Sequence, residues 1–97
     1  MEYEFRARLW LYEGQGAWHF VTLPKNITAE VRRVFGQNRR GWGSIRVLAT
    51  AGENSWRTSI FPDNKSGSYL LPIKSQIRKE NHLRAGNKLN IRIKIEL

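Results

Sequence analysis

The sequence predicts a mainly β protein: a small closed six-stranded β-barrel with a pseudo-twofold internal repeat and two short helices. Two observations predict this fold. Apolar and polar residues alternate along several segments, as in strands that have one buried and one solvent-exposed face. In addition, one succession of elements occurs twice in 97 residues: strand, Leu-Pro, short basic helix, Gly turn and alternating strand. Two such units in one chain favour a single small barrel.

The repeat is degenerate but ordered. Its first copy runs through residues 20–24, 31–33 and 43–47. Its second copy runs through residues 68–72, 77–79, 86 and 89–93. The aliphatic-Arg-basic triplet begins at Val31, seven residues after Pro24, in the first copy, and at Ile77, five residues after Pro72, in the second. At this length the chain has room for one domain, so we expect residues 1–97 to form a single β-barrel.

Six strands are expected. In Tyr3–Leu11 the apolar residues fill every odd position, and Leu89–Leu97 repeats the pattern. Between these two segments we expect strands at residues 17–23, 44–49, 55–61 and 68–71. Turn residues separate them: Gly14-Gln15-Gly16, residues 51–54 and residues 62–67.

The first and last strands can pair with each other. Opposite charges would then face each other across the exposed side of the sheet, which stabilises a strand pair. These charges are Glu2 and Glu4 on one strand and Arg92 and Lys94 on the other. On the buried side we expect a core that includes Trp18, Phe20, Trp56 and Ile91.

Two short helices should interrupt the strands. Apolar residues recur at helical spacing between positions 27 and 35, with Thr28 as the candidate N-cap and Gly36 as the candidate end. The second helix follows Pro72, with Ser75 as its candidate cap. Pro24 and Pro72 each close a strand, because proline cannot donate a ladder hydrogen bond.

The chain is strongly basic. Seventeen Lys and Arg residues against eight Asp and Glu residues give a net charge of +9 and a pI near 10.7. Such a field attracts nucleic acid, small phosphate or carboxylate molecules, anionic membrane surfaces and acidic proteins. The alternative is a solvated basic surface that only keeps the protein soluble, because the charges are spread along the chain.

The composition excludes several classes of protein. There is no cysteine, so neither a disulfide framework nor a thiolate site can form. We expect a cytoplasmic protein, because a reducing compartment suits a chain without cysteine. The charged start and the short uncharged stretches predict neither a signal peptide nor a transmembrane helix, and hence no membrane partner.

Catalysis is disfavoured, and no metal or cofactor is predicted. His19 and His82 lie in different units without metal-ligand spacing. The eight carboxylates are scattered over strands, helices and turns, whereas general acid-base catalysis needs two of them in one cleft. The serines lack the context of an activated nucleophile, and the Gly-x-Gly segments do not form a phosphate loop. We therefore expect a protein that is not an enzyme.

A family resemblance covers nearly the whole chain. It rests on residues 16–24 (Gly-Ala-Trp-x-Phe-Val-x-Leu-Pro), 56–62 (Trp-Arg-Thr-Ser-Ile-Phe-Pro) and 69–72 (Tyr-Leu-Leu-Pro), followed by 77–79 (Ile-Arg-Lys) and Gly86. The chain resembles the bacterial family called "domain of unknown function nineteen-oh-five". The resemblance implies a small closed β-barrel, alone or joined to other domains, and no established activity. The chain departs from the family pattern at Asn87, where Asp usually follows the Gly.

The second unit has a further resemblance. Residues 71–91 are similar to the swapped-hairpin motif of AbrB-like transition-state regulators, which build one barrel from two chains and bind DNA with its basic surface. This similarity spans roughly a fifth of the sequence and rests on common residue types. It supports a barrel better than it supports DNA binding.

The segment Arg39-Arg40-Gly41-Trp42-Gly43 is a candidate recognition site. The guanidiniums of Arg39 and Arg40 can bind phosphates through two hydrogen bonds each, and Trp42 can present its ring to a base. In the alternative, Trp42 folds back onto the barrel and the two arginines are simply solvated.

A second candidate site involves Arg57. Alternation places Trp56 and Arg57 on opposite faces of the strand 55–61, so Arg57 points outward if Trp56 is core. If the barrel has an open mouth, Arg57 and Arg78 could line an anion pocket with Trp18 and Tyr69 as its aromatic set. In the alternative, aromatic side chains close the barrel and Arg57 binds backbone carbonyls.

Two functions remain open at this point. The first is a non-catalytic binding module for an anionic ligand, either nucleic acid or a small phosphate- or carboxylate-bearing molecule. Three basic pairs motivate it, which the repeat could bring to one end of the barrel: Arg32/Arg33, Arg39/Arg40 and Arg78/Lys79. The second is a protein-interaction or accessory domain, in which the charge is a solvated surface and another protein docks on a strand edge.

Overall fold

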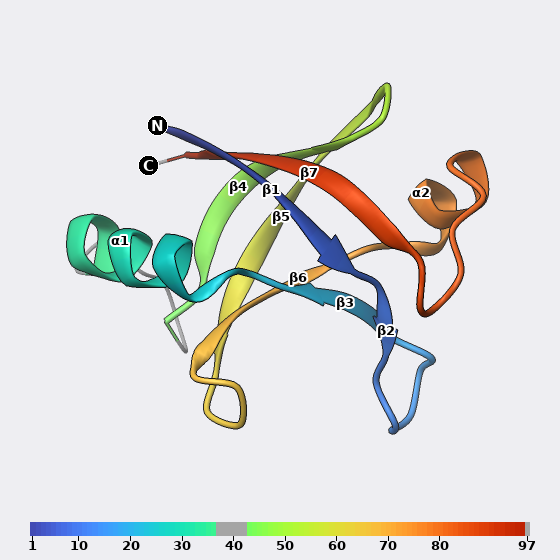
Figure 1. The fold of residues 1–97 in the computed structure, drawn as a ribbon, viewed down its shortest axis with the longest axis horizontal. Coiled ribbons are helices and arrows are strands. Elements are labelled where there is room, and N and C mark those ends of the chain that lie inside the picture. The colour runs from blue at the N-terminus through green and yellow to red at the C-terminus, as the bar shows by residue number, and fades with distance from the viewer. Residues whose placement is uncertain (37–42, 97) are drawn as a thin grey trace.

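The chain folds into one curved antiparallel sheet with a helix at each end (Figure 1). The computed structural model describes residues 1–36 and 43–96, which contain seven strands and two helices. The elements are β1 (Glu2–Arg8), β2 (Trp10–Leu11), β3 (His19–Thr22), α1 (Lys25–Phe35), β4 (Ile45–Ala51), β5 (Asn54–Asp63), β6 (Ser68–Pro72), α2 (Ser75–Glu80) and β7 (Lys88–Ile95). Neighbouring strands follow the order β1-β7-β4-β5-β6-β3-β2.

A single hydrophobic cluster fills the concave side of the sheet. Along β4 and β7 every second residue is buried, as the alternating sequence predicts. The helices add Ile27, Val31 and Phe35 from α1 and Ile77 from α2 to the same cluster. The helices therefore close the two ends of the curved sheet with apolar side chains.

The sheet is an open half-barrel, so the prediction of a closed six-stranded barrel was wrong. The expected first strand divides at Leu9 into β1, which pairs with β7, and β2, which pairs with β3. These two strands form the edges of the sheet. In the described residues no ladder joins these two edge strands to each other, so the hydrogen-bonded sheet stays open.

The bend at Leu9 is held by the chain before β7. The Leu9 N–H donates to the Asn87 carbonyl at 2.8 Å, and the Leu9 carbonyl accepts from the Gly86 N–H at 2.7 Å. The Leu9 side chain is fully buried. Gly86 has φ +97°, a conformation that residues with a Cβ rarely adopt. The glycine of the second repeat unit thus fixes the point at which the first strand divides.

The predicted repeat appears in the order of elements. The succession strand, helix, strand occurs as β3-α1-β4 and again as β6-α2-β7. Equivalent strands also pair with each other, β3 with β6 and β4 with β7, and both ladders are antiparallel. A twofold axis between the two units would produce these pairings.

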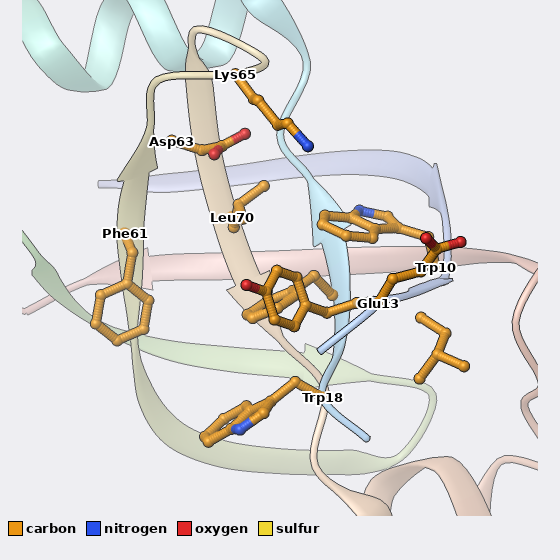
Figure 2. Close-up of a pocket in the computed structure, with 10 residues that line it drawn as sticks. Trp10, Glu13, Trp18, Phe61, Asp63, Lys65 and Leu70 are labelled. Carbon is orange, nitrogen blue, oxygen red and sulfur yellow. The ribbon is translucent and has the colours of Figure 1, made fainter. Parts of the chain in front are cut away.

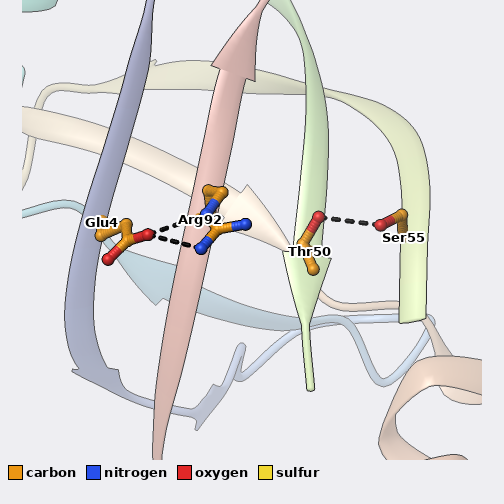
Figure 3. Close-up of polar contacts among 4 residues, drawn as sticks. All are labelled: Glu4, Thr50, Ser55 and Arg92. Atoms are coloured by element: carbon orange, nitrogen blue, oxygen red, sulfur yellow. Dashed lines mark hydrogen bonds and ion pairs between the residues drawn. The ribbon is translucent and has the colours of Figure 1, made fainter. Parts of the chain in front are cut away.

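The predicted pairing of the terminal strands is confirmed. Glu2 lies opposite Lys94 and Glu4 lies opposite Arg92 in the β1–β7 ladder. The carboxylate of Glu4 accepts a hydrogen bond from Arg92 Nε at 2.8 Å and lies 2.6 Å from Nη2 in the same ion pair (Figure 3). Both side chains are more than half exposed, so solvent weakens this ion pair.

The core prediction holds for two of its four residues. Trp56 and Ile91 are 6% and 2% exposed. Phe20 is only half-buried, and Trp18, which is 54% exposed, was wrongly predicted to be core. Ala17 has φ +50°, so the chain turns immediately before Trp18 and β3 begins only at His19.

Both predicted N-caps were wrong, whereas the predicted end of the first helix is confirmed. Helix α1 begins after Pro24, whose ring fixes a φ suited to a helix start. Thr28 is instead buried within α1, where its Oγ1 accepts a hydrogen bond from the Tyr69 N–H at 3.4 Å. Lys74 is the N-cap of α2, and Ser75 is its first residue. Gly36 is the C-cap of α1.

Replacing Trp56 by Ala should lower the free energy of unfolding by about 3–5 kcal/mol, because it removes a large buried ring. The matched change Trp18→Ala should have a much smaller effect, because that ring is mostly solvated. Urea denaturation of the two variants measures both effects. Equal losses would contradict the assigned burial.

Replacing Gly86 by Ala should destabilise the fold by about 1–2 kcal/mol, because a Cβ is disfavoured at its positive φ. Nothing lies within 4 Å of a Cβ at this position, so the cost is conformational and not steric. Gly36→Ala is the control, since Gly36 has φ −60° and the nearest atom would be 3.8 Å away. Thermal melts should show a lower Tm for the first variant only.

Candidate functional site

A hollow of about 680 Å³ lies on the outer face of β2, β3, β5 and β6. Five of its ten lining side chains are aromatic: Trp10, Tyr12, Trp18, Phe20 and Phe61. We call this concavity the aromatic hollow. Figure 2 shows Trp10, Trp18 and Phe61 around it, with Asp63 and Lys65 at one side. The volume lies within the range typical of small-molecule sites.

Strand alternation places the rings of the hollow outside the core. Val21 and Leu71 are fully buried and lie opposite each other in the β3–β6 ladder. Their neighbours Phe20 and Leu70 therefore point to the outer face. On β5 the same alternation buries Ile60 and exposes Phe61. The hollow is thus built on outward positions of strands whose inward positions make the core.

Three of the rings pack around Phe20. The centroid of its ring lies 5.3 Å from that of Trp10, 6.3 Å from that of Tyr12 and 6.1 Å from that of Trp18. The Trp18 and Phe20 rings are nearly parallel, at 9°. The indole N–H of Trp10 donates to Thr22 Oγ1 at 3.0 Å, which holds this ring in place. Packing of this kind fixes the orientation of the exposed rings.

Asp63 gives the hollow a fixed negative charge at the turn between β5 and β6. Hydrogen bonding by the Ser66 side chain, and then by the Ser66 and Lys65 backbone, holds the pKa of Asp63 below its ordinary value of 3.8. Its Oδ2 accepts the Ser66 N–H at 3.0 Å. Glu13 and Lys65 are the other charged residues that line the hollow.

A second concavity, of about 330 Å³, adjoins the first. It lies between the start of β3, the outer side of β5 and the residues that lead into α2, and Trp18 lines both concavities. Three cationic side chains line it: Arg57, Lys74 and Arg78. We call it the cationic cleft. Its lining also includes the buried Trp56, which forms part of its floor from the core side.

A chain of hydrogen bonds orients Arg78 in the cleft. Its Nε donates to the Ile73 carbonyl at 3.2 Å, and its Nη1 lies 3.3 Å from His19 Nε2. The other ring nitrogen of His19, Nδ1, lies 2.9 Å from the Ala17 carbonyl, which can only accept. Nδ1 therefore carries the proton, and Nε2 accepts from Arg78. The guanidinium is thus fixed by two partners that carry no negative charge.

Two ion pairs occur among the described residues, and one of them reaches the cleft. Arg57 Nε lies 3.3 Å from a carboxylate oxygen of Glu96. Arg57 therefore binds a carboxylate, and not the backbone carbonyls that one alternative expected. In residues 1–36 and 43–96, neither Lys74 nor Arg78 has a carboxylate within ion-pair distance. Two of the three cations of the cleft therefore have no ion-pair partner among the described carboxylates.

A third concavity, also of about 330 Å³, lies on the far side of α2. Ser75 and Arg78 line both this concavity and the cationic cleft. Its further cations are Lys79 and Arg84, and His82 also lines it. We call it the α2 hollow.

The predicted site residues are only partly brought together. Arg57 and Arg78 line the same cleft with Trp18, and Lys79 lies in the adjoining α2 hollow. Tyr69 does not join them, because it is 2% exposed and belongs to the core. The Arg32 guanidinium lies 5.7 Å from the centre of the Tyr69 ring. Arg39, Arg40 and Trp42 fall outside the described residues.

The basic pairs of the two helices do not gather at one end. Arg32 and Arg33 lie in the last turn of α1, and Arg78 and Lys79 lie in the last turn of α2. The two helices lie at opposite ends of the long axis (Figure 1). The expectation that the repeat would bring these basic pairs to one end of the barrel was therefore wrong for the two helices.

Several residues of the site were not predicted from the sequence: Trp10, Tyr12, Phe61 and Lys74. The sequence did contain a signal for Phe61. Alternation places Ile60 and Phe61 on opposite faces of their strand, and Phe61 lies on the outward face with Arg57. An aromatic residue on a predicted outward face indicates a binding surface better than one on an inward face. For Lys74 the sequence offers no comparable signal.

The comparisons with known proteins identify a family. A family model described as "Domain of unknown function (DUF1905)" matches residues 5–93. The chain belongs to this family. A search of curated proteins finds no match. The sequence-based identification of the family is therefore confirmed, while the similarity of the second unit to AbrB-like regulators stays a prediction.

Two further observations concern the described part of this family member. None of its helices is long and apolar enough to cross a membrane. Within residues 1–36 and 43–96, no three His, Asp or Glu side chains lie in a group that could hold a metal ion.

The Asp63 carboxylate should make the β5–β6 turn sensitive to acid. Because folding lowers its pKa, the ionised group stabilises the folded chain above pH 4, and this stabilisation is lost as the pH falls through the folded pKa. The Tm difference between the wild type and Asp63→Asn should therefore shrink between pH 6 and pH 3. A difference that stays constant over this range would contradict the assigned hydrogen bonds.

Proposed function

We propose that this domain is a non-catalytic binding module for an anionic ligand, which it holds in the cationic cleft. The observation that carries the proposal is the pair Lys74 and Arg78, which line one concavity with Trp18 and have no carboxylate partner among the described residues. Burying or clustering charge without a counter-charge is unfavourable, so such a pair favours an external anion.

Arg78 has the donors that an anion needs. A guanidinium carries five N–H groups, and the bonds to Ile73 and His19 occupy two of them. The remaining N–H groups can bind two oxygens of one phosphate or carboxylate, which is the strongest arrangement available to arginine. His19 acts as a positioning residue, because it holds the guanidinium without neutralising it.

The surroundings of the cleft suit a bound small molecule or the end of a larger one. A volume of about 330 Å³ accommodates a phosphate or carboxylate group with part of the molecule that carries it. The net charge of +9 raises the local concentration of anions around the domain. We place this activity in the bacterial cytoplasm, as expected for the family and for a chain without cysteine.

The alternative function is that of a protein-interaction or accessory domain. The exposed edge of β1 and the aromatic hollow are the surfaces that it would use. The cationic cleft favours the anion-binding proposal, because a surface whose charges only maintain solubility has no reason to orient an arginine with neutral hydrogen-bond partners.

Titration calorimetry with inorganic pyrophosphate, citrate and adenosine monophosphate at low salt tests the proposal. At least one of them should bind saturably with one-to-one stoichiometry. Lys74→Ala and Arg78→Lys should each weaken that binding about tenfold or more, the fold-change expected when a hydrogen bond to a charged group is lost. Arg78→Lys keeps the positive charge but loses the pair of N–H donors that can bind two oxygens of one anion.

Arg46→Ala is the matched control. Arg46 is an exposed cation on β4 that lines none of the three concavities. Arg46→Ala lowers the net charge by the same amount as Lys74→Ala. Because it removes no charge from the cleft, it should have little effect on the affinity for the anion. Absence of binding to all three probes, or an equal loss in Arg46→Ala, would contradict the proposal and favour the protein-interaction domain.

A further inference from the structure

The three concavities adjoin one another along one path over the surface, because each shares lining residues with the next. Trp18 belongs both to the aromatic hollow and to the cationic cleft. Ser75 and Arg78 belong both to the cationic cleft and to the α2 hollow. A ligand larger than one pocket can therefore contact all three concavities, from the β2–β3 hairpin to the far side of α2.

The chemistry changes along this path in a definite order. At one end are aromatic rings, of which Tyr12 and Trp18 are about half exposed. In the middle and at the other end are cations without carboxylate partners among the described residues: Lys74, Arg78, Lys79 and Arg84. The path thus offers flat apolar surfaces beside a row of positive charges.

We propose that the path binds single-stranded nucleic acid, with bases stacked in the aromatic hollow and phosphates held along the cationic cleft and the α2 hollow. The proposal rests on the anion-binding function and names its ligand class. Proteins that bind single strands combine these two features, aromatic rings for the bases and a positive groove for the backbone. Stacking needs an unpaired base, so a duplex cannot use the hollow.

The charges within the aromatic hollow support nucleic acid over an acidic protein. Glu13 and Asp63 line the hollow and would repel the carboxylates of an acidic peptide. A base is uncharged, and when it is unpaired its N–H groups, such as the N3–H of thymine, can donate a hydrogen bond to a carboxylate. Asp63 offers such a carboxylate at the side of the hollow, where its Oδ2 already accepts the Ser66 N–H. A strand with bases at one end of the path and phosphates along the rest meets both requirements.

Fluorescence anisotropy with three labelled probes of equal length tests the proposal: a twelve-nucleotide oligothymidylate, the same strand with abasic sites throughout, and a twelve-base-pair duplex. The oligothymidylate should bind most tightly. Its affinity should fall with salt, with a slope of log K against log salt of at most about 3, because four cations release about 0.7 counterion each on a single strand.

Two pairs of variants separate the parts of the path. Trp18→Ala should weaken oligothymidylate binding about 5- to 150-fold, the fold-change that corresponds to loss of one stacked base, and Trp18→Phe should restore part of it. The control Val34→Ala removes exposed apolar surface on α1, away from the path, and should have no effect. Neither Trp18→Ala nor its control should change binding of the abasic strand.

The second pair tests the phosphate contacts. Lys74→Ala with Lys79→Ala should lower the salt slope by about 1–2, because two phosphate contacts are lost. Arg33→Ala with Arg46→Ala removes the same charge outside the path and should leave the slope nearly unchanged.

The outcomes distinguish the two proposals. If pyrophosphate or the mononucleotide binds in the cleft but the oligothymidylate binds no more tightly, the anion-binding function stands and the single-strand proposal is wrong. Equal affinity for the thymidylate and abasic strands, or no effect of Trp18→Ala, also overturns it. If neither small anions nor strands bind, both proposals are wrong.

Discussion

The bend at Leu9 is the constraint on which the rest of the structure depends. Two backbone hydrogen bonds to Gly86 and Asn87 hold it, and its side chain is fully buried. Buried backbone groups must find partners, and at this position the partners come from the opposite end of the chain. The bend directs β1 to β7 and β2 to β3. Both edges of the half-barrel therefore come from one segment of the chain.

The aromatic hollow follows from the same bend. Because β2 pairs with β3, Trp10 lies directly opposite Phe20, and the hairpin that follows returns Trp18 to the same surface. The connection from β6 to α2 then places Lys74 and Arg78 beside Trp18. Single exposed apolar residues are normal, but a group of partly exposed rings next to cations that pair with none of the described carboxylates is characteristic of a binding surface. The fold thus brings Trp10, Trp18 and Phe20 near two cations, Lys74 and Arg78, that lie more than fifty residues later in the sequence.

The candidate site could be predicted in part. Alternation in the strand around Trp56 correctly placed Arg57 on the outer side, because the period of two is a local property of strands. Tyr69 was selected for its ring alone, and burial removed it from the site. Trp18 was selected as core for the same reason, and the left-handed backbone of Ala17 turns it to the surface. Residue type does not decide burial when a turn lies next to a strand.

The sequence by itself determined most of the strands, the two helices and the order in which they follow one another, because hydrophobic period and proline act locally. It only allowed the pairing of the terminal strands, which the structure then showed. Only the tertiary structure decided that the barrel stays open and that Thr28 lies within a helix. It alone decided that Trp18, Arg57, Lys74 and Arg78 share one cleft. These outcomes depend on hydrogen bonds and packing between segments far apart in the chain, such as Leu9 with Gly86 and Thr28 with Tyr69. No local pattern in the sequence encodes such contacts.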